Sequence, residues 1–300
     1  MKVLITGIKG FVATNLSKFF TSEGVYYQAI SLRGGWHNQV SLDDFDAVIH
    51  LAGLAHDLNS KSLEEDYYNV NSELTKQLYE AYINSSATKF IFLSSVKAAA
   101  DSVIGILKEV DAANPNTIYG KSKLKAERAI LDASLNSEKT YYILRPCMIH
   151  GPGNKGNLNL LYNFITRKIP YPLAAFENKR SFLSIDNLNF VINELLKTND
   201  IPSGIYNVAD TEPLSTNSVV KIISASVKIK AQLWYVPRSM IRALAKVGDV
   251  FSLPINSSTL SKLTENYVVS NEKLLNALRK DLPISSEEGL FITAGSFAKK

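Results

Sequence analysis

The stretch Thr6-Gly7-Ile8-Lys9-Gly10-Phe11-Val12-Ala13 joins an apolar strand to a helix through a glycine-rich turn, and it decides the fold. Gly7 permits the tight turn, Gly10 lets the backbone approach a pyrophosphate, and Ala13 is small enough for the helix to pack on the strand. The start of the helix presents unpaired N–H groups and its positive dipole end to an anion. The stretch therefore predicts a dinucleotide-binding turn, with contacts from Gly7, Lys9, Gly10, Phe11 and Val12.

Composition places the chain among ordinary globular proteins, with 300 residues of which 46% are hydrophobic and 20% charged. The single cysteine, Cys147, excludes a disulfide framework within the chain, and no cysteine cluster suggests a metal site. We see no leader and no apolar run of about 18 residues, so we expect a cytoplasmic protein without a membrane partner. The net charge of +5 is interpreted as dispersed surface lysines, and no basic–aromatic pattern predicts nucleic-acid binding.

Apolar strands alternate with amphipathic helices through the first half of the chain. Strands are predicted at 2–6, 26–32, 46–52, 89–94 and 140–145, and helices at 11–23, 72–84 and 119–135. This alternation predicts an α/β fold with a doubly wound, Rossmann-like parallel sheet, and residues 1–150 as the dinucleotide-binding domain. The interval from Gly34 to Phe45 is short, so we expect only a trimmed strand near Gln39–Leu42 and little or no helix there.

Glycine, asparagine and proline become frequent from Gly151 onward, and the alternation of strands and helices is lost. We interpret residues 151–300 as a smaller, substrate-binding lobe over the carboxyl ends of the strands, where doubly wound folds bind ligands. Residues 181–210 are expected to return in part to the first domain. Within them, Phe182–Ile185 and Gly204–Val208 are predicted to be strands that rejoin the sheet and form its edge.

Tyr119 and Lys123 lie four residues apart near a predicted helix start, so they share one face of that helix. An ammonium beside a phenol favours the phenolate, which predicts a lowered pKa for Tyr119 and proton exchange with an alcohol or sugar oxygen. Ser95 follows the apolar strand that begins at Lys89, at the carboxyl end of the sheet, which opens onto the ligand crevice. Its hydroxyl is placed to bind the reacting oxygen, although a serine there can also serve only as a cap.

Three motifs in this order resemble the extended short-chain dehydrogenase/reductases, and more narrowly the nucleoside-diphosphate-sugar epimerase/reductase group. They are Thr6–Ala13, Phe92-Leu93-Ser94-Ser95 and Tyr119-Gly120-Lys121-Ser122-Lys123. Further matches are His50–Gly53, Asn69–Asn71, Arg145-Pro146, Gly151–Gly153 and Arg180–Asn187. The resemblance covers nearly the whole chain.

This resemblance implies a catalytic triad of Ser95, Tyr119 and Lys123. Tyr119 would be the general acid/base, Lys123 would lower its pKa and bind the nicotinamide ribose, and Ser95 would orient the substrate oxygen. The resemblance also implies a cofactor cleft lined by Leu51, Ala52, Gly53, Asn71, Lys123, Pro146 and Cys147. For Asn71 a structural role as a cap or bridge is an equal alternative, and Cys147 is interpreted as packing.

The substrate residues are implied by the same resemblance. Arg180 falls where relatives bind the substrate diphosphate, which suits a planar and permanently charged fork. Asn157 or Asn159 would hydrogen-bond the diphosphate from the first helix of the lobe. Arg238 and Arg242 are candidates for a second phosphate-binding arginine, but their spacing matches no pattern that identifies one.

The end of the second predicted strand bears on the cofactor. NAD-binding relatives usually carry an acidic residue there for the ribose 2′-hydroxyl, and this sequence has none. Ser31 and Arg33 can instead receive a 2′-phosphate, with Lys9 as a second cation. The sequence therefore favours NADP(H), with NAD(H) as the alternative.

These observations leave three functions open. The first is an NADPH-dependent reductase that converts the C4 carbonyl of a nucleotide-linked 4-keto sugar to a hydroxyl, with Tyr119 as proton donor. The second is an NAD-dependent C4 epimerase of a nucleotide sugar, and the third is a non-enzymatic dinucleotide-binding regulator. A 4,6-dehydratase is disfavoured, because Val96-Lys97-Ala98 lacks the carboxylates which that chemistry uses. By resemblance, the helices at 72–84 and 119–135 predict a homodimer.

Overall fold

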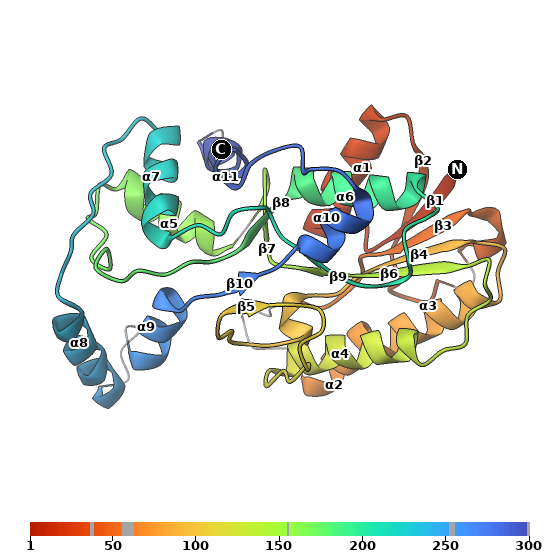
Figure 1. Ribbon diagram of the computed structural model, residues 1–300, viewed down its shortest axis with the longest axis horizontal. Helices are drawn as coiled ribbons and strands as arrows, with labels where there is room; N and C mark the ends of the chain where they lie inside the picture. Colours follow the sequence, from red (N-terminus) through yellow and green to blue (C-terminus); the bar gives the residue numbers. More distant parts are fainter. Residues whose placement is uncertain (37–38, 56–62, 155, 252–255, 299–300) are drawn as a thin grey trace.

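A computed structural model of the chain describes residues 1–36, 39–55, 63–154, 156–251 and 256–298. Its centre is a six-stranded parallel sheet in the order β2-β1-β3-β4-β6-β9 (Figure 1). The strands are β1 (Lys2–Thr6), β2 (Tyr26–Ile30), β3 (Ala47–His50), β4 (Lys89–Leu93), β6 (Thr140–Pro146) and β9 (Gly204–Val208). The strand order reverses on either side of β1, which confirms the predicted doubly wound sheet.

Helices cover both faces of this sheet, because the central strands are apolar on both sides. On one face lie α1 (Phe11–Ser22) and α6 (Ile185–Lys197), which pack with Val3 and Ile5 in one core. On the other face lie α3 (Leu74–Ile83) and α4 (Ile118–Leu131), which pack with Leu4 and Phe90 in a second core (Figure 1).

The strand predicted near Gln39–Leu42 does not form, and this expectation was wrong. Leu42–Asp44 instead forms one turn of 3-10 helix, which begins where the Ser41 hydroxyl accepts a hydrogen bond from the Asp43 amide. Leu42 and Phe45 are buried beneath the sheet rather than paired to its edge. As a result β2 is one of the two edge strands of the described sheet, with β9 (Gly204–Val208) at the other edge.

The helix predicted at 72–84 begins earlier than expected. It starts with α2 (Glu64–Tyr68), passes through a π-helical turn at Asn69–Glu73, and continues as α3. The π turn buries Asn71 and Ser72 against α4. Such turns widen a helix locally and are frequent at functional sites.

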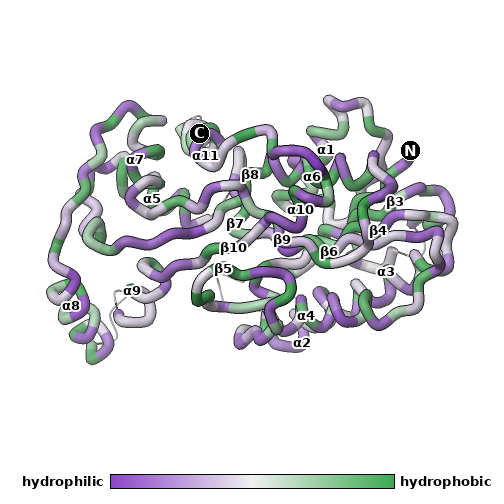
Figure 2. The backbone as a smooth tube through the Cα atoms, viewed as in Figure 1, coloured by the Kyte–Doolittle hydropathy of each residue, from purple (hydrophilic) through white to green (hydrophobic). Residues whose placement is uncertain are grey.

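Apart from α6 and one strand that joins the central sheet, most described residues beyond β6 build a smaller lobe, which Figure 2 shows beside the sheet. This lobe has cores of its own. β8 (Phe182–Ser184) forms as predicted, but it pairs with β7 (Met148–His150) in a separate sheet and does not rejoin the central one. β9 does join the central sheet, beside β6. A further parallel pair joins β5 (Ile106–Leu107) to β10 (Val268–Val269).

The described residues after β6 form six further helices. They are α5 (Asn157–Thr166), α7 (Thr216–Ser226), α8 (Arg238–Val250), α9 (Ser257–Thr264), α10 (Glu272–Leu278) and α11 (Ser286–Phe297). In the ranges that the structure describes, no helix combines the length and apolar character needed to cross a bilayer.

Candidate active site

The glycine turn after β1 has the geometry that an anion site requires. Gly7 has a φ of +83°, and a Cβ there would lie 2.8 Å from the Ala52 nitrogen, so only glycine fits. The Gly7 amide donates to the Ile30 carbonyl at 3.0 Å, which ties the turn to the end of β2. Gly10 begins α1 without a side-chain cap among the described residues, so the first amides of the helix remain available. The turn therefore fits a dinucleotide pyrophosphate.

A buried hydrogen-bond chain holds the ends of β1 and β3 together beneath this turn. The His50 ring bonds the Thr6 hydroxyl at 2.8 Å and the Thr75 hydroxyl at 2.9 Å. The Thr6 hydroxyl also accepts from the Ala52 amide at 3.2 Å. Burial lowers the pKa of His50 to about 3, so the ring stays neutral and acts as a structural bridge.

The structure brings Ser95, Tyr119 and Lys123 to the carboxyl end of β4. Ser95 follows that strand, its hydroxyl accepts from the Lys97 amide at 3.2 Å, and its side chain hydrogen-bonds Tyr119. Lys123 lies on α4, where its ammonium donates to the Leu93 carbonyl at 2.9 Å and sits 4.8 Å from the centre of the Phe92 ring. The predicted triad therefore meets beside the loop that follows β3.

The pKa shift of Tyr119 in the structure differs from the shift that the sequence predicts. Burial raises the pKa of Tyr119, and the hydrogen bond with Ser95 opposes this effect. Burial also lowers the pKa of Lys123 to about 8, while the nearby Glu127 carboxylate raises it. The expected lowering of the phenol pKa by Lys123 is thus not found in the protein alone: burial dominates the shift, Tyr67 adds to it, and only the hydrogen bond with Ser95 lowers the pKa.

A buried ion pair that the sequence analysis did not predict lies close to Lys123. Glu127 receives two hydrogen bonds from the Arg145 Nε and a third from Nη2 at 2.6 Å, and both side chains are almost fully buried. The Ser94 hydroxyl donates to the same carboxylate at 2.5 Å. Glu127 lies one helical turn after Lys123, so the spacing of Lys123 and Glu127 on one helix face was the signal available.

Asn71 takes the bridging role that the sequence left open. Its Oδ1 accepts from the Leu54 amide at 2.7 Å, and its Nδ2 donates to the Leu54 carbonyl at 2.9 Å and the Ser122 hydroxyl at 3.0 Å. The loop after β3 is thereby fixed to α4. A Cβ at Gly53 would lie 3.0 Å from the Lys123 ammonium nitrogen, so this glycine permits the close approach of loop and lysine.

The remaining predicted cofactor residues follow the strand ends. Leu51 and Ala52 are partly exposed after β3, and Pro146 ends β6. The Cys147 amide donates to the Val208 carbonyl at 3.0 Å, and burial raises the pKa of its thiol far above the usual value, which favours packing over chemistry. The predicted 2′-phosphate residues Lys9 and Arg33 are both exposed, and the Ser31 hydroxyl accepts from the Arg33 amide at 3.3 Å.

Arg180 lies where the smaller lobe meets the loop after Ser95. Its Nη1 donates to the Lys262 carbonyl at 2.7 Å. Lys97, which sequence reasoning did not single out as a binding residue, donates to the Asp101 carbonyl at 2.7 Å and sits 4.4 Å from the centre of the Tyr267 ring. Burial lowers the pKa of Lys97, the Asp101 and Glu265 carboxylates oppose this effect, and the charge of Arg180 adds to it. Lys97, which lies two residues after Ser95, therefore shares this region with the Arg180 cation and with the Asp101 and Glu265 carboxylates.

Ser184 and Asn187, in the family-like segment Arg180–Asn187, have structural roles. The Ser184 side chain caps α6, and the amide of Ser184 donates to both oxygens of the Asp210 carboxylate at 3.0 Å. The Asn187 amide group donates to the same carboxylate at 2.7 Å. These bonds fix the smaller lobe to the end of β9.

The other candidates for the diphosphate lie elsewhere on the lobe. Asn157 is exposed at the first turn of α5, and the Asn159 amide group donates to the Asn154 carbonyl at 2.7 Å. Arg238 and Arg242 lie on α8, which Figure 1 places at the end of the lobe far from the strands of the central sheet. The structure therefore does not bring these two arginines to the triad.

Comparison with known proteins identifies the family. Residues 3–209 match the family model described as NAD dependent epimerase/dehydratase, so the chain belongs to that family of extended short-chain enzymes. Its fold, its glycine turn and the meeting of Ser95, Tyr119 and Lys123 agree with this assignment.

Three similar proteins come from bacteria. UDP-glucose 4-epimerase of Vibrio cholerae is 27% identical, covering 98% of this chain and 95% of the relative. N-acetyl-alpha-D-glucosaminyl-diphospho-ditrans,octacis-undecaprenol 4-epimerase of Escherichia coli O157:H7 is 29% identical, covering 78% of this chain and 75% of the relative. The crystal structure of UDP-glucuronic acid 4-epimerase from Bacillus cereus in complex with NAD superposes with a TM-score of 0.76 at 19% identity, covering 100% of this chain and 99% of that one.

Proposed function

We propose that the protein is a C4 epimerase of a nucleotide-linked hexose. The observation that carries this proposal is the meeting of Ser95, Tyr119 and Lys123 at the carboxyl end of β4, beside a glycine turn fit for a dinucleotide. The V. cholerae relative, which spans nearly the same length, supports epimerisation over the net reduction that the sequence favoured.

The reaction needs a base, a hydride carrier and a fixed sugar oxygen. Tyr119 takes the proton of the C4 hydroxyl, and the Ser95 hydroxyl hydrogen-bonds the same oxygen. Tyr119 returns the proton after the 4-keto sugar has rotated to present its opposite face. When bound, the nicotinamide ring would accept the C4 hydride and give it back, and its positive charge when oxidised would favour the Tyr119 phenolate. Lys123 would hold the cofactor ribose, and its ammonium donates a hydrogen bond to the Leu93 carbonyl, which fixes its position.

The substrate diphosphate would lie against Arg180 and Lys97. Lys97 lies two residues after Ser95 and within range of the Arg180 charge, and a diphosphate carries the charges that two such groups bind. A sugar linked through a diphosphate is common to the nucleotide sugar and to the lipid-linked substrate named for the E. coli relative. We commit to the nucleotide sugar, because the relative that covers 98% of the chain acts on one.

A second function, the NADPH-dependent reduction of a 4-keto sugar, rests on a different observation. Lys9 and Arg33 are both exposed at the end of β2, where the 2′ position of the adenosine ribose falls in this fold, and no carboxylate follows that strand. These cations favour a 2′-phosphate, and a reduced NADP pool suits net reduction.

One experiment separates the two functions. The purified protein is incubated with UDP-glucose without added cofactor, and the cofactor released by denaturation is identified by chromatography. Epimer formation with released NAD supports the epimerase. No epimer, together with oxidation of added NADPH by a 4-keto sugar nucleotide, establishes the reductase instead.

Two variants sharpen this test. Arg33→Ala should raise preference for NAD over NADP if Arg33 binds a 2′-phosphate, while Arg128→Ala, at an exposed arginine on α4, should leave the preference unchanged. Equal affinity of the wild type for the two cofactors would refute the 2′-phosphate interpretation.

We also propose that α3 and α4 form a homodimer interface. Leu78, Ala126 and Ile130 are buried against the protein's own sheet, so the contact would use the outer residues, among them Leu131, which is 43% exposed. A monomer mass by light scattering at micromolar concentration would exclude this dimer.

A further inference from the structure

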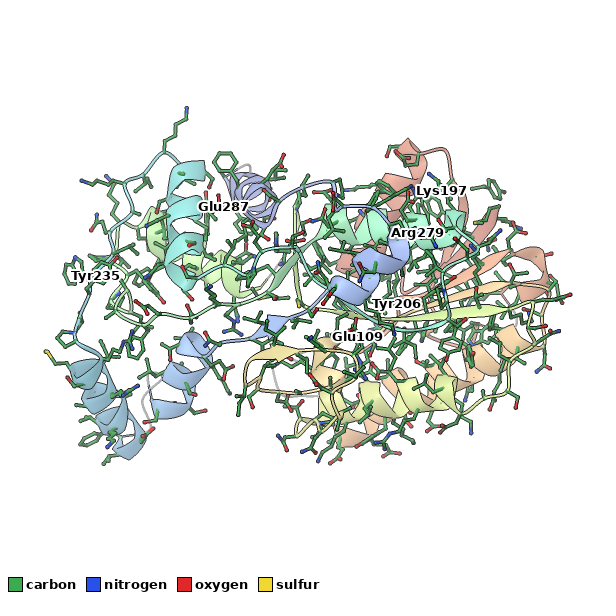
Figure 3. All side chains as sticks on the ribbon, in the orientation of Figure 1. Glu109, Lys197, Tyr206, Tyr235, Arg279 and Glu287 are labelled. Carbon is green, nitrogen blue, oxygen red and sulfur yellow. The ribbon has the colours of Figure 1, made fainter. Side chains whose placement is uncertain are left out.

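Lys123 buries a positive charge within the site. Its side chain is 4% exposed, and its ammonium donates to the Leu93 carbonyl at 2.9 Å and lies 4.8 Å from the centre of the Phe92 ring. Side chains fill the layer between α4 and the central sheet (Figure 3). A carbonyl and a ring face replace only part of the hydration that a charged ammonium loses on burial. An anion close by is therefore what this ammonium needs to keep its proton.

Among the described residues, the other groups on the elements around Lys123 supply no buried anion. His50 of β3 is neutral, because burial lowers its pKa to about 3 and the charge of Lys123 adds to this effect. Tyr119 keeps its proton at neutral pH, because burial raises the pKa of its phenol. The carboxylates of α2 are exposed, and Glu73 of the π turn pairs with Lys125 at 2.6 Å. Further side chains on the elements packed against α4 are phenols or cations, namely Tyr67 of α2, Tyr79 of α3, Lys97 after Ser95 and Arg145 of β6.

Glu127 is the carboxylate that is buried with this ammonium. It lies about one helical turn after Lys123 on α4, so both side chains share one face of the helix. Glu127 is 0% exposed. Burial lowers the pKa of Lys123 to about 8, and the Glu127 carboxylate opposes this effect. One face of α4 therefore brings an anion and a cation together out of contact with water.

Two neighbouring strands hold the Glu127 carboxylate in place. Arg145 Nε donates to both of its oxygens, at 2.9 and 3.2 Å, and Nη2 donates to one of them at 2.6 Å. The Ser94 hydroxyl donates to Oε1 at 2.5 Å. Ser94 and Arg145 come directly after a paired position of β4 and β6, so both donors lie at adjacent strand ends. These bonds fix the carboxylate at the end of the sheet where the Lys123 ammonium also docks.

We propose that Glu127 is a positioning residue of the triad, which keeps Lys123 charged so that its ammonium binds the cofactor ribose. This inference rests on the dinucleotide binding proposed above. An ammonium has three N–H donors, of which one serves the Leu93 carbonyl and two are left for ribose hydroxyls, whereas a neutral amine has one donor fewer. Glu127 is fully buried, so it acts through Lys123 and not by touching cofactor or substrate.

The alternative is a purely structural ion pair that only joins α4 to β6. Arg145→Met and the double variant Glu127→Gln/Arg145→Met separate the two interpretations. Both variants lack the ion pair, and glutamine keeps the shape of glutamate and an oxygen that accepts from Ser94. The two proteins therefore differ by one buried negative charge. A purely structural pair makes their pH profiles alike, whereas a charge that acts on Lys123 makes them differ.

The first readout is the affinity for NADH, measured by fluorescence from pH 6.5 to 9.5. In the wild type the affinity should begin to fall near pH 8, by up to about tenfold per pH unit, as Lys123 loses its proton. In Glu127→Gln/Arg145→Met the fall should begin about one pH unit lower, because a neighbouring opposite charge has been removed. Arg145→Met retains the carboxylate, so its affinity should begin to fall no earlier than that of the wild type.

The second readout needs no cofactor. Lys123→Met is introduced into the wild type and into Glu127→Gln/Arg145→Met, and the difference in unfolding free energy within each pair is measured in urea against pH. This difference begins to shrink at the folded pKa of Lys123, because above it the unfolded chain binds more protons than the folded one. That point lies near pH 8 in the wild type and should lie about one pH unit lower without the Glu127 carboxylate.

Glu73→Gln is the matched control, because it also removes a carboxylate beside α4. The Glu73 side chain is 42% exposed and its partner Lys125 is 55% exposed, so water and salt screen this charge. Both pH profiles of Glu73→Gln should match those of the wild type. Circular dichroism and thermal unfolding confirm that each variant is folded.

The outcomes separate the charge from the structural role. The same onset pH in Arg145→Met and the double variant would overturn the proposal and leave the pair as a structural link. If Arg145→Met does not fold, the wild type and the double variant provide the same comparison, and an equal onset pH overturns the proposal there too. A protein that binds no NADH contradicts the proposed function, and the urea measurement then still decides whether Glu127 holds the charge on Lys123.

Discussion

Replacing Lys123 by methionine should make the protein more stable at neutral pH while destroying its activity. Lys123 is 4% exposed, and burial lowers its pKa from 10.5 to about 8. That difference corresponds to about 3 kcal/mol by which burial of the charge opposes folding. Methionine removes this cost and also the hydrogen bond to the Leu93 carbonyl, a loss of about 1 kcal/mol. The net expected gain at pH 7 is about 2 kcal/mol.

The pH dependence follows from the direction of the shift. Below pH 8 both folded and unfolded chains carry the charged lysine, and the wild type bears the full cost. Between the folded pKa of about 8 and the unfolded value of 10.5, the unfolded chain binds more protons, so wild-type stability rises with pH relative to the variant. The advantage of Lys123→Met should therefore shrink from about 2 kcal/mol at pH 7 to zero near pH 10.

The assay is urea unfolding of both proteins at intervals from pH 7 to 10.5, taking the difference in free energy at each pH so that other titrating groups cancel. Lys125→Met is the control, because Lys125 is exposed and pairs with Glu73 at 2.6 Å. Its effect should stay within about 1 kcal/mol at every pH. A Lys123→Met variant no more stable than the wild type at pH 7, or a difference that does not vary with pH, would refute the reasoning.

Three further predictions follow from the same contacts. Tyr119→Phe should lower the turnover number about 1000-fold, because the variant loses proton transfer. Its substrate affinity, measured by calorimetry, should change little. A loss of turnover below tenfold would exclude Tyr119 as the acid/base. Gly7→Ala should abolish binding of NADH measured by fluorescence, because the added Cβ meets the Ala52 nitrogen at 2.8 Å on a backbone with φ of +83°; retained binding would contradict the pyrophosphate site. Arg145→Met should cost about 3–5 kcal/mol of unfolding free energy by leaving Glu127 buried and unpaired, and Arg145→Met with Glu127→Gln should recover most of it. Equal losses in the single and double variants would show that the unpaired charge is not the cause.

Local signals in the sequence predicted most of the central fold. β1, β4, β6 and β9 are short apolar runs between polar turns, and their positions agree with the predicted ranges to within a residue or two. The glycine turn was predictable because the positive φ of Gly7 is a local requirement. Helix spacing predicted that Tyr119 and Lys123 share one helix face, and the resemblance to a known family implied their meeting with Ser95.

Features that depend on distant residues were not predictable in the same way. The strand near Gln39–Leu42 was wrong because Ser41 caps a 3-10 turn, and a short polar interval is compatible with either structure. The Glu127–Arg145 pair joins α4 to β6, so the spacing of Lys123 and Glu127 points to Glu127 but not to its distant partner Arg145. The raised pKa of Tyr119 depends on burial by the assembled site.

The central claim is that this site transfers hydrogen at C4 of a sugar nucleotide. The most direct measurement uses UDP-glucose deuterated at C4, incubated with the protein alone and followed by mass spectrometry and NMR. The account predicts the C4 epimer with deuterium still at C4, because the hydride leaves and returns within one site. Epimer that has exchanged its label with water, or no epimer at all under conditions where the protein is folded and holds NAD, would contradict it.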